Sequence, residues 1–249
     1  SLSHRGWHPS RLPEGNADND RASITRTRHQ RRLTGAVTGV ELTIVLVAVV
    51  IGSISKAVTG MGMPMIVIPI AALFTDIGDT VVVIALPNLL ANAVLVVGER
   101  EHARETRDLP ALAVTGGIGA VIGTLLFVNV PDEPLVIVLI VAIVVYITTF
   151  FLKPDLRTSP EQSRRLSPFA GLLAGTFQGA IGISGPVVGS WIHSFRLPRG
   201  AHIFSVTLLF LVAGSTQLIV LIVNGELGGR IVATLLACIP VLAVIPIGT

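Results

Sequence analysis

Four residues in the first apolar segment of this 249-residue chain could together bind an anion: Lys56, Gly60, Gly62 and Pro64. Glycine weakens a helix and proline suits a first helical turn, so the pattern predicts a helix that breaks at the glycines and restarts at Pro64. The first N–H groups of the restarted half-helix carry the positive end of its dipole, which attracts anions. Lys56, about one turn before the break, either adds a positive charge to this site or extends to an interface and caps free carbonyls.

The same device recurs at Gly182-Ile-Ser-Gly-Pro186, which adds the hydroxyl of Ser184. When the two breaks are aligned, Gln178 occupies the place of Lys56. Two such breaks facing each other would bind a small anion from both sides. The predicted substrate-binding residues are Lys56, Thr59, Gly60, Met61, Gly62, Met63, Pro64, Gln178, Gly182, Ile183, Ser184, Gly185 and Pro186.

Other polar residues in the apolar segments either line a path for the substrate or hydrogen-bond between helices. They include Asn88, Asn92, Ser205, Thr207 and Gln217. The sequence has no His, Cys, Asp or Glu cluster with metal-ligand spacing and no nucleotide-binding Gly-Lys-Ser/Thr signature. We therefore expect no metal, no cofactor and no ATP hydrolysis by this chain.

Long apolar runs must position these residues. Hydrophobic residues make up 51% of the chain and charged residues only 13%, against about 25% charged in soluble domains. Four runs, at 80–98, 109–130, 135–152 and 201–225, contain no charged residue, and each approaches or exceeds the roughly 20 residues that cross a bilayer. The pattern predicts an all-α, polytopic helical membrane protein whose partners are the lipid bilayer and a small anionic substrate. The basic residues lie in loops and in the N-terminal tail, so nucleic acid is not expected; the oligomeric state stays open.

The chain divides into a tail and two similar halves. We predict a disordered basic tail at 1–36, a first transmembrane repeat at 37–152, a cytoplasmic linker at 153–167 and a second repeat at 168–249. Each half begins with a broken helix followed by simple spans in the same orientation, as in internally duplicated transporters. Seven spans are expected here, and comparison of the halves predicts that an eighth is missing, unless the protein naturally has seven.

Loop charges predict the orientation if each interrupted segment crosses the membrane once. The tail, with seven Arg, then lies on the same side as the basic loops 99–108 and 153–165 and as Arg230. The opposite side carries only Arg196 and Arg199. By the positive-inside rule, the N-terminus and the arginine-rich loops are cytoplasmic and the protein lies in the cell membrane.

The two interrupted segments resemble those of the TauE/SafE family of sulfite and organosulfur anion transporters. In that family each half carries a motif of the form G-x-G-G-G, followed by an apolar stretch and proline. Gly60, Gly62 and Pro69 match this pattern, whereas Met63 and Pro64 replace the later glycines.

In the second half, Gly182, Gly185 and Pro186 are similar to a G-x-G-G-P variant, with Ser184 at a usual glycine. The resemblance implies about eight spans and a secondary transporter, not an enzyme, that exports sulfite, a sulfonate or a related sulfur oxyanion. A passive anion channel built on the same breaks is the alternative. A membrane-embedded enzyme or assembly factor is a more distant one, because intramembrane catalysis would call for acidic or histidine side chains within the spans.

Overall fold

The computed structural model describes residues 39–152 and 157–245, in which every regular element is a helix. The predicted tail 1–36 and the last four residues lie outside the described part. The main helices are α2 (Gly39–Thr59), α3 (Met63–Ala71), α4 (Ile77–Gly98), α5 (Leu109–Asn129), α6 (Asp132–Leu152), α7 (Pro160–Ile181), α8 (Gly185–His193), α9 (Arg199–Val223) and α10 (Ile231–Val244). Two short 3₁₀ helices, η1 (Arg100–Glu105) and η2 (Gly228–Arg230), complete the order.

The helices have the length and surface of membrane spans. Helices α4, α5 and α9 are each long and apolar enough to cross a bilayer. Apolar side chains also cover outward faces: Ile118 on α5 is 52% exposed and Ile137 on α6 is 62% exposed. A soluble protein rarely leaves so much apolar surface uncovered. The chain is a polytopic helical membrane protein, as its composition predicts.

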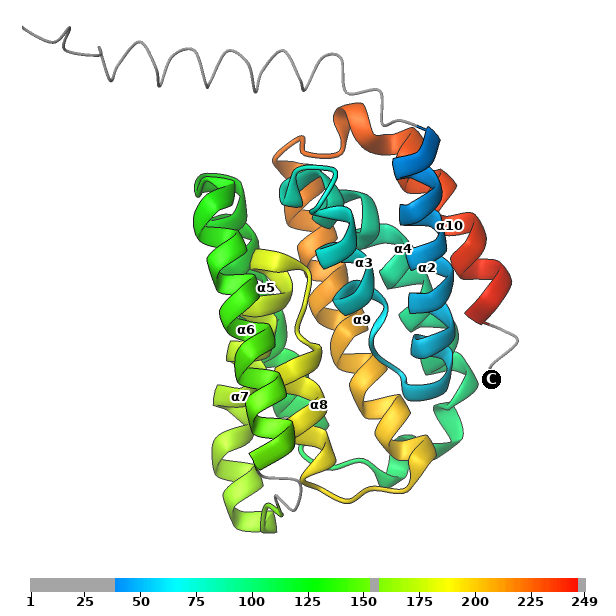
Figure 1. Ribbon diagram of the computed structural model, residues 1–249. Coiled ribbons are helices and arrows are strands. Elements are labelled where there is room, and N and C mark those ends of the chain that lie inside the picture. Colours follow the sequence, from blue (N-terminus) through cyan, green and yellow to red (C-terminus); the bar gives the residue numbers. More distant parts are fainter. Residues whose placement is uncertain (1–38, 153–156, 246–249) are drawn as a thin grey trace, which may run out of the picture. The chain divides into compact units, whose positions relative to one another are not determined.

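The first interrupted segment is a hairpin of two helices. Helix α3 lies beside α2 and runs back along it (Figure 1). A Cβ atom added at Gly52 of α2 would lie 3.1 Å from Met63 Cα and 3.3 Å from Val67 Cγ2 of α3. If α3 continued the direction of α2, these residues would be more than about 15 Å from Gly52, given the rise of 1.5 Å per residue. The chain therefore reverses at 60–62.

The second interrupted segment is also a hairpin, formed by α7 and α8. The indole Nε1 of Trp191, near the end of α8, donates a hydrogen bond to Ser167 Oγ near the start of α7 over 3.1 Å. Just before α7, the N–H of Thr158 donates to the carbonyl of Ser194, just after α8, over 3.2 Å. Both ends of this segment therefore lie at the same end of the helix bundle.

The hairpins correct the prediction that each interrupted segment crosses the membrane once. Each segment returns to the side on which it begins, so the predicted halves would run in opposite directions and not in the same one. The sequence reasoning failed because glycines with positive φ allow a full reversal of the chain as readily as a kink. The internal repeat itself remains a prediction.

The reversals also redistribute the loop charges between the two ends of the bundle. The loops 99–108, 157–165 and 194–199 meet at one end: Ser163 Oγ donates to Asp108 Oδ2, and Arg107 lies over the ring of Phe195. Eight arginines belong to this arginine-rich end: Arg100, Arg104, Arg107, Arg157, Arg164, Arg165, Arg196 and Arg199.

The opposite, acidic end holds the start of α4 and the segment between α9 and α10. Here Arg230 Nε donates to Asp79 Oδ1 over 2.8 Å, and Glu226 pairs with the same guanidinium. Helix α2 begins at this end, because its last turn lies at the other one, where Arg199 donates to the carbonyl of Val58. Arg196 and Arg199 thus join the basic loops, whereas Arg230 lies opposite them, the reverse of the prediction for these three residues.

Helix α7 begins earlier than its apolar run. Pro160 occupies the first turn, and Ser159 and Gln162 form a capping box with reciprocal hydrogen bonds of 3.3 Å. Eight residues of the predicted linker 153–167, from Pro160 to Ser167, are therefore helical and project α7 beyond its apolar part. The capping signal Ser-Pro-x-Gln was visible in the sequence.

Helices α5 and α7 form the closest helix pair in the bundle. Gly171, Gly175 and Gly179 follow one another at four-residue intervals on α7 and face Gly116 and Ala120 of α5. A Cβ atom at Gly175 would come within 3.0 Å of the backbone of both partners. Small residues at this spacing let two membrane helices approach to backbone contact. The pair therefore holds α7, and with it the second hairpin, in a fixed position.

Candidate functional site

A glycine in the left-handed conformation ends the long arm of each hairpin. Gly60 has φ 77° and Gly182 has φ 69°, a region that side chains with Cβ rarely adopt. The Gly60 N–H donates to Lys56 O over 2.8 Å, and the Gly182 N–H donates to Gln178 O over 2.9 Å. Both breaks are thus helix C-caps built in the same way, and Lys56 and Gln178 hold equivalent places in the last turns.

The short arms of the two hairpins lie side by side and run in opposite directions. A Cβ at Gly182 would lie 2.9 Å from Ile68 Cδ1, and one at Gly185 would lie 2.8 Å from Met65 Sδ. Further along α8, a Cβ at Gly189 would lie 2.9 Å from Met61 Sδ. These contacts bring the beginning of α3 level with the beginning of α8.

A small cavity lies where the two short arms begin. It has room for about one water molecule. Both breaks contribute to its wall, and so do α4 and α9. The lining residues are Gly62, Pro64, Met65, Asn88, Phe210, Gln178, Gly182, Ile183, Ser184 and Gly185.

The electrostatics of this cavity favour a negative charge. The first turns of α3 and α8 begin at its wall, and the first N–H groups of a helix have no partner within the helix. Pro64 and Pro186 lie in these first turns, where the missing proline N–H costs no helical hydrogen bond. Two positive dipole ends therefore meet at one point, an arrangement that binds small anions.

The polar side chains of the second hairpin are bonded to one another. Ser184 Oγ donates to Gln178 Oε1 over 2.9 Å, and Gln178 Nε2 donates to Gln217 Oε1 over 3.1 Å. Gln217 is 1% exposed and comes from α9. These hydrogen bonds hold the wall of the cavity in place and leave the backbone N–H groups as the main donors on that side.

Lys56 lies next to the cavity, behind Phe210. Its side chain is 0% exposed, and its Nζ stands 5.2 Å from the centroid of the Phe210 ring. Among the described residues, Nζ has no hydrogen-bond partner and takes part in no ion pair. The interpretation that Lys56 extends to an interface does not fit this burial. A buried ammonium without a partner is costly, and an anion beside it would offset that cost.

The remaining predicted residues lie around the turns of the two hairpins and do not line the cavity. Thr59 Oγ1 donates to the carbonyls of Ser55 and Met61 and so stabilises the turn between α2 and α3. Gly60 packs against Ile203 and Thr207 of α9. Met61, Met63 and Pro186 pack around the breaks, and Met63 is fully buried.

Three lining residues were not among the predicted substrate-binding residues: Met65, Asn88 and Phe210. Asn88 carried a signal, as a polar residue within an apolar span, but the sequence did not separate it from residues that bond between helices. Phe210 carried none, because an apolar residue in an apolar helix gives no sign of its neighbours.

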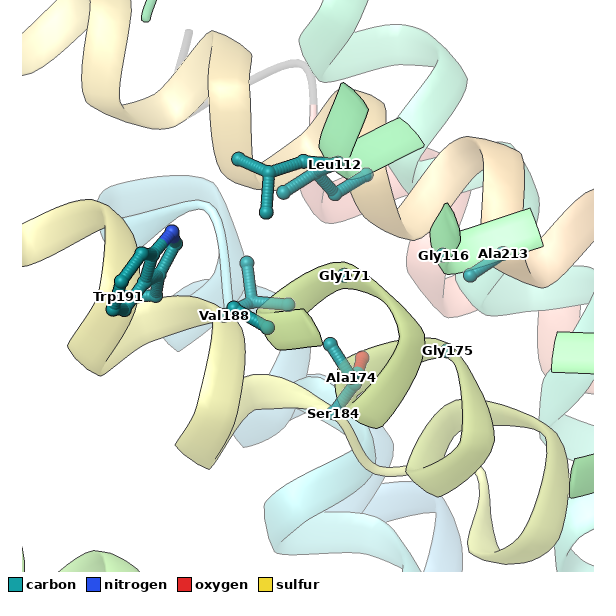
Figure 2. Close-up of a pocket in the computed structure, with 11 residues that line it drawn as sticks. Leu112, Gly116, Gly171, Ala174, Gly175, Ser184, Val188, Trp191 and Ala213 are labelled. Carbon is teal, nitrogen blue, oxygen red and sulfur yellow. The ribbon is translucent and has the colours of Figure 1, made fainter. Parts of the chain in front are cut away.

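A second, mostly apolar cavity adjoins the first at Ser184, which lines both. Figure 2 shows Ser184 beside Ala174, with Val188 and Trp191 of α8 on one side and Leu112 and Gly116 of α5 on the other. Since Trp191 lies near the end of α8, this cavity extends from the breaks toward the arginine-rich end.

A family model described as "Sulfite exporter TauE/SafE" matches residues 44–249. The search of curated proteins and the search of solved structures each found no match. The matched region contains the cavity and both hairpins, apart from the first five residues of α2.

Proposed function

Since this chain belongs to the sulfite exporter TauE/SafE family, we propose that it is a secondary transporter that carries a small sulfur oxyanion, sulfite or a sulfonate, out of the cell across the cell membrane. The family supplies the transport function and the membrane setting. The choice of substrate, the coupled mechanism and the outward direction are parts of this proposal.

One observation carries the proposal most directly: the helix starts of two oppositely running hairpins line a single buried cavity. Transporters with broken helices place half-helix N-termini against anionic substrate groups near the membrane midplane. In this role, backbone N–H groups near Gly62 and Gly185 donate to the oxyanion. Lys56 supplies the compensating charge from behind Phe210, and Gln178 and Ser184 hold the wall in place.

The cavity is too small for sulfite, with space for about one water molecule. Binding requires the two hairpins to move apart by a small distance, and alternating access follows if they separate first on one side and then on the other. The apolar cavity beside Ser184 is the proposed path to the arginine-rich end, which faces the cytoplasm by the positive-inside rule.

Ligand-dependent thermal stability of the purified full chain tests the binding site. Sulfite should raise the melting temperature with concentration, since a ligand at 100 times its Kd adds about 2.7 kcal/mol to the stability. Gly185→Leu fills the cavity and should abolish the shift. Gly228→Leu is the matched control, because a Cβ there would meet no atom within 4 Å. A shift that survives Gly185→Leu would place the ligand elsewhere.

Transport against a gradient separates the proposed transporter from a passive channel. Proteoliposomes that hold the full chain and an outward or inward proton gradient are given labelled sulfite at equal concentrations on both sides. A coupled transporter concentrates sulfite on one side, and the accumulation disappears when an ionophore removes the gradient. A channel only equalises the two concentrations and would replace the transporter proposal.

A further inference from the structure

The apolar cavity beside the anion site ends at Trp191. Ser184, Val188 and Trp191 all line this cavity and follow one another along α8, so it extends from the break toward the end of that helix (Figure 2). Beyond Trp191, toward the arginine-rich end, Ser167 is 0% exposed and Phe195 is 7% exposed. The cavity is therefore closed at this end, and Trp191 is the lining residue next to the closure.

One hydrogen bond and one ring contact hold the indole of Trp191 in this place. Its Nε1 donates to Ser167 Oγ over 3.1 Å, which joins α8 to α7. The indole also meets the Phe195 ring edge to face, with 5.8 Å between the centroids. Arg107 Cζ lies 5.0 Å from the centroid of Phe195, and the Arg107 side chain is 24% exposed. A stack of three side chains thus extends from the buried cavity to the surface.

The backbone of Trp191 is held separately from its side chain. Ser194 Oγ donates to the carbonyl of Trp191 over 2.7 Å, and Thr158 Oγ1 donates to Ser194 Oγ over 2.7 Å. The indole can therefore change its rotamer while the end of α8 stays in place. A single hydrogen bond between membrane helices is weak, so a closure that depends on one is readily reversed.

We propose that the Trp191 indole is the gate between the anion site and the arginine-rich end, and that the Ser167 hydroxyl holds this gate closed. When the bond breaks and the indole turns out of the cavity, a path opens from Ser184 toward Arg107. This inference rests on the proposed function, since it names the residue that closes one side of the same site. Alternating access requires such a residue, because the two sides must not be open together.

Labelling of a cysteine inside the cavity measures how often the gate opens. Ala174 lines the cavity beside Ser184 and is buried, so Ala174→Cys in a Cys238→Ser background places a single thiol behind the gate (Figure 2). The probe is 2-sulfonatoethyl methanethiosulfonate, an anion that does not enter through the apolar surface. The thiolate forms a disulfide with the sulfonatoethylthio group and releases methanesulfinate. The labelling rate is measured on the purified full chain.

Two substitutions remove the same hydrogen bond from its two sides. Ser167→Ala removes the acceptor, and Trp191→Phe removes the donor but keeps an aromatic ring. Each should raise the labelling rate about threefold to tenfold, the factor by which the loss of one such bond shifts an equilibrium between open and closed states. The double variant should label no faster than the faster single variant, because the two residues act through one bond.

Ser205→Ala is the matched control for Ser167→Ala. Ser205 is also fully buried, but its hydroxyl donates to the carbonyl of Ala201 in its own helix over 2.7 Å. Its labelling rate should stay within about twofold of the parent. If Ser167→Ala and Trp191→Phe lower the melting temperature but leave the labelling rate unchanged, the bond has a purely structural role and the gate is overturned.

Trp191→Ala tests the indole itself. Its removal should raise the labelling rate above that of either variant that removes only the bond. A cysteine at position 174 that stays unlabelled in folded Trp191→Ala contradicts closure by Trp191.

Fluorescence keeps the test decisive if the cysteine variants do not fold. The chain has two tryptophans, so Trp7→Phe leaves Trp191 as the only one. In this background, Ser167→Ala should raise the quenching constant of iodide about twofold or more, and an unchanged constant overturns the gate.

The failure of the gate and the failure of the proposed function are distinguishable, because neither labelling nor quenching uses sulfite. A chain that shows a sulfite-dependent rise in melting temperature but whose labelling ignores Ser167 and Trp191 contradicts the gate alone. A chain whose labelling responds to these residues but which never binds sulfite contradicts the proposed function.

Discussion

At the scale of single residues, Lys56 presents the clearest conflict between stability and function. Its ammonium group is fully buried, lies over the Phe210 ring and has no hydrogen-bond partner among the described residues. A cation–π contact recovers only about 2 kcal/mol even when desolvated, less than the cost of burying a charge alone. A protein keeps such a group when a ligand supplies the missing charge.

Lys56→Met should therefore stabilise the empty protein while weakening the anion site. Replacing an unpaired buried charge by an apolar side chain of similar length removes the cost of its desolvation, so the change is neutral or stabilising. The melting temperature without ligand should stay level or rise, and the Kd for sulfite should increase about tenfold or more, equivalent to about 1.4 kcal/mol. Thermal unfolding with and without sulfite measures both effects in one experiment.

The control for Lys56→Met is Arg164→Met, which removes a positive charge from an exposed position on α7. This variant should leave both the melting temperature and the affinity for sulfite unchanged. An unaltered affinity in Lys56→Met would remove Lys56 from the site. A large loss of stability without ligand would show that Lys56 has a structural partner instead.

The residues around the breaks could be predicted from their types, but their pairing could not. Gly62, Pro64, Gly182 and Gly185 line one cavity, as two facing breaks require. The hydrogen bond between Ser184 and Gln178 could not be predicted from the sequence, because it depends on the angle at which the chain leaves Gly182. That angle follows from tertiary packing, which local sequence does not encode.

At the scale of helices, the two glycine breaks could be located from the sequence, whereas the direction of the chain after them could not. A glycine with positive φ at a helix end is compatible with both a kink and a reversal. The reversal is set by packing: Gly52 of α2 leaves room for Met63 and Val67 of α3, so the arms lie against each other. The sequence shows a glycine at position 52, but the reason for it becomes clear only from the packing of α3 against α2.

Helix α7 makes a further prediction at this scale, since its glycines touch the backbone of α5. Gly175→Val should lower the melting temperature by about 5 °C or more, because the added methyl groups would overlap the backbone around Gly116 and Ala120. Gly229→Val is the matched control, since a Cβ there meets nothing within 4 Å. Thermal unfolding followed by size-exclusion chromatography measures the difference.

The same helix pair is also expected to matter for transport. If the second hairpin is held by α5, a variant that loosens this contact should lose sulfite binding before it unfolds. Equal stability of Gly175→Val and Gly229→Val would contradict the close packing of α5 and α7.

At the scale of the whole molecule, the two hairpins determine which loops lie at the same end of the bundle. They therefore determine which membrane orientation the loop charges predict. Eight arginines belong to the loops and helix starts of one end, and Arg230 at the other end is paired with Asp79 and Glu226. The positive-inside rule applied to these loops places the arginine-rich end in the cytoplasm. Helix α2 then begins on the outer side, so the seven arginines of the tail and those of the loops favour opposite orientations.

Chemical labelling of single cysteines in intact cells resolves this conflict. In a Cys238→Ser background, Arg104→Cys and Gly228→Cys place one thiol at each end of the bundle, and a membrane-impermeant maleimide labels only the outer one. We expect Gly228→Cys to react and Arg104→Cys to react only after the membrane is permeabilised, because eight arginines spread over three short loops should outweigh one tail. The reverse pattern would place the tail and the start of α2 in the cytoplasm, as the tail charges predict, and the apolar cavity beside Ser184 would then lead from the anion site to the outside.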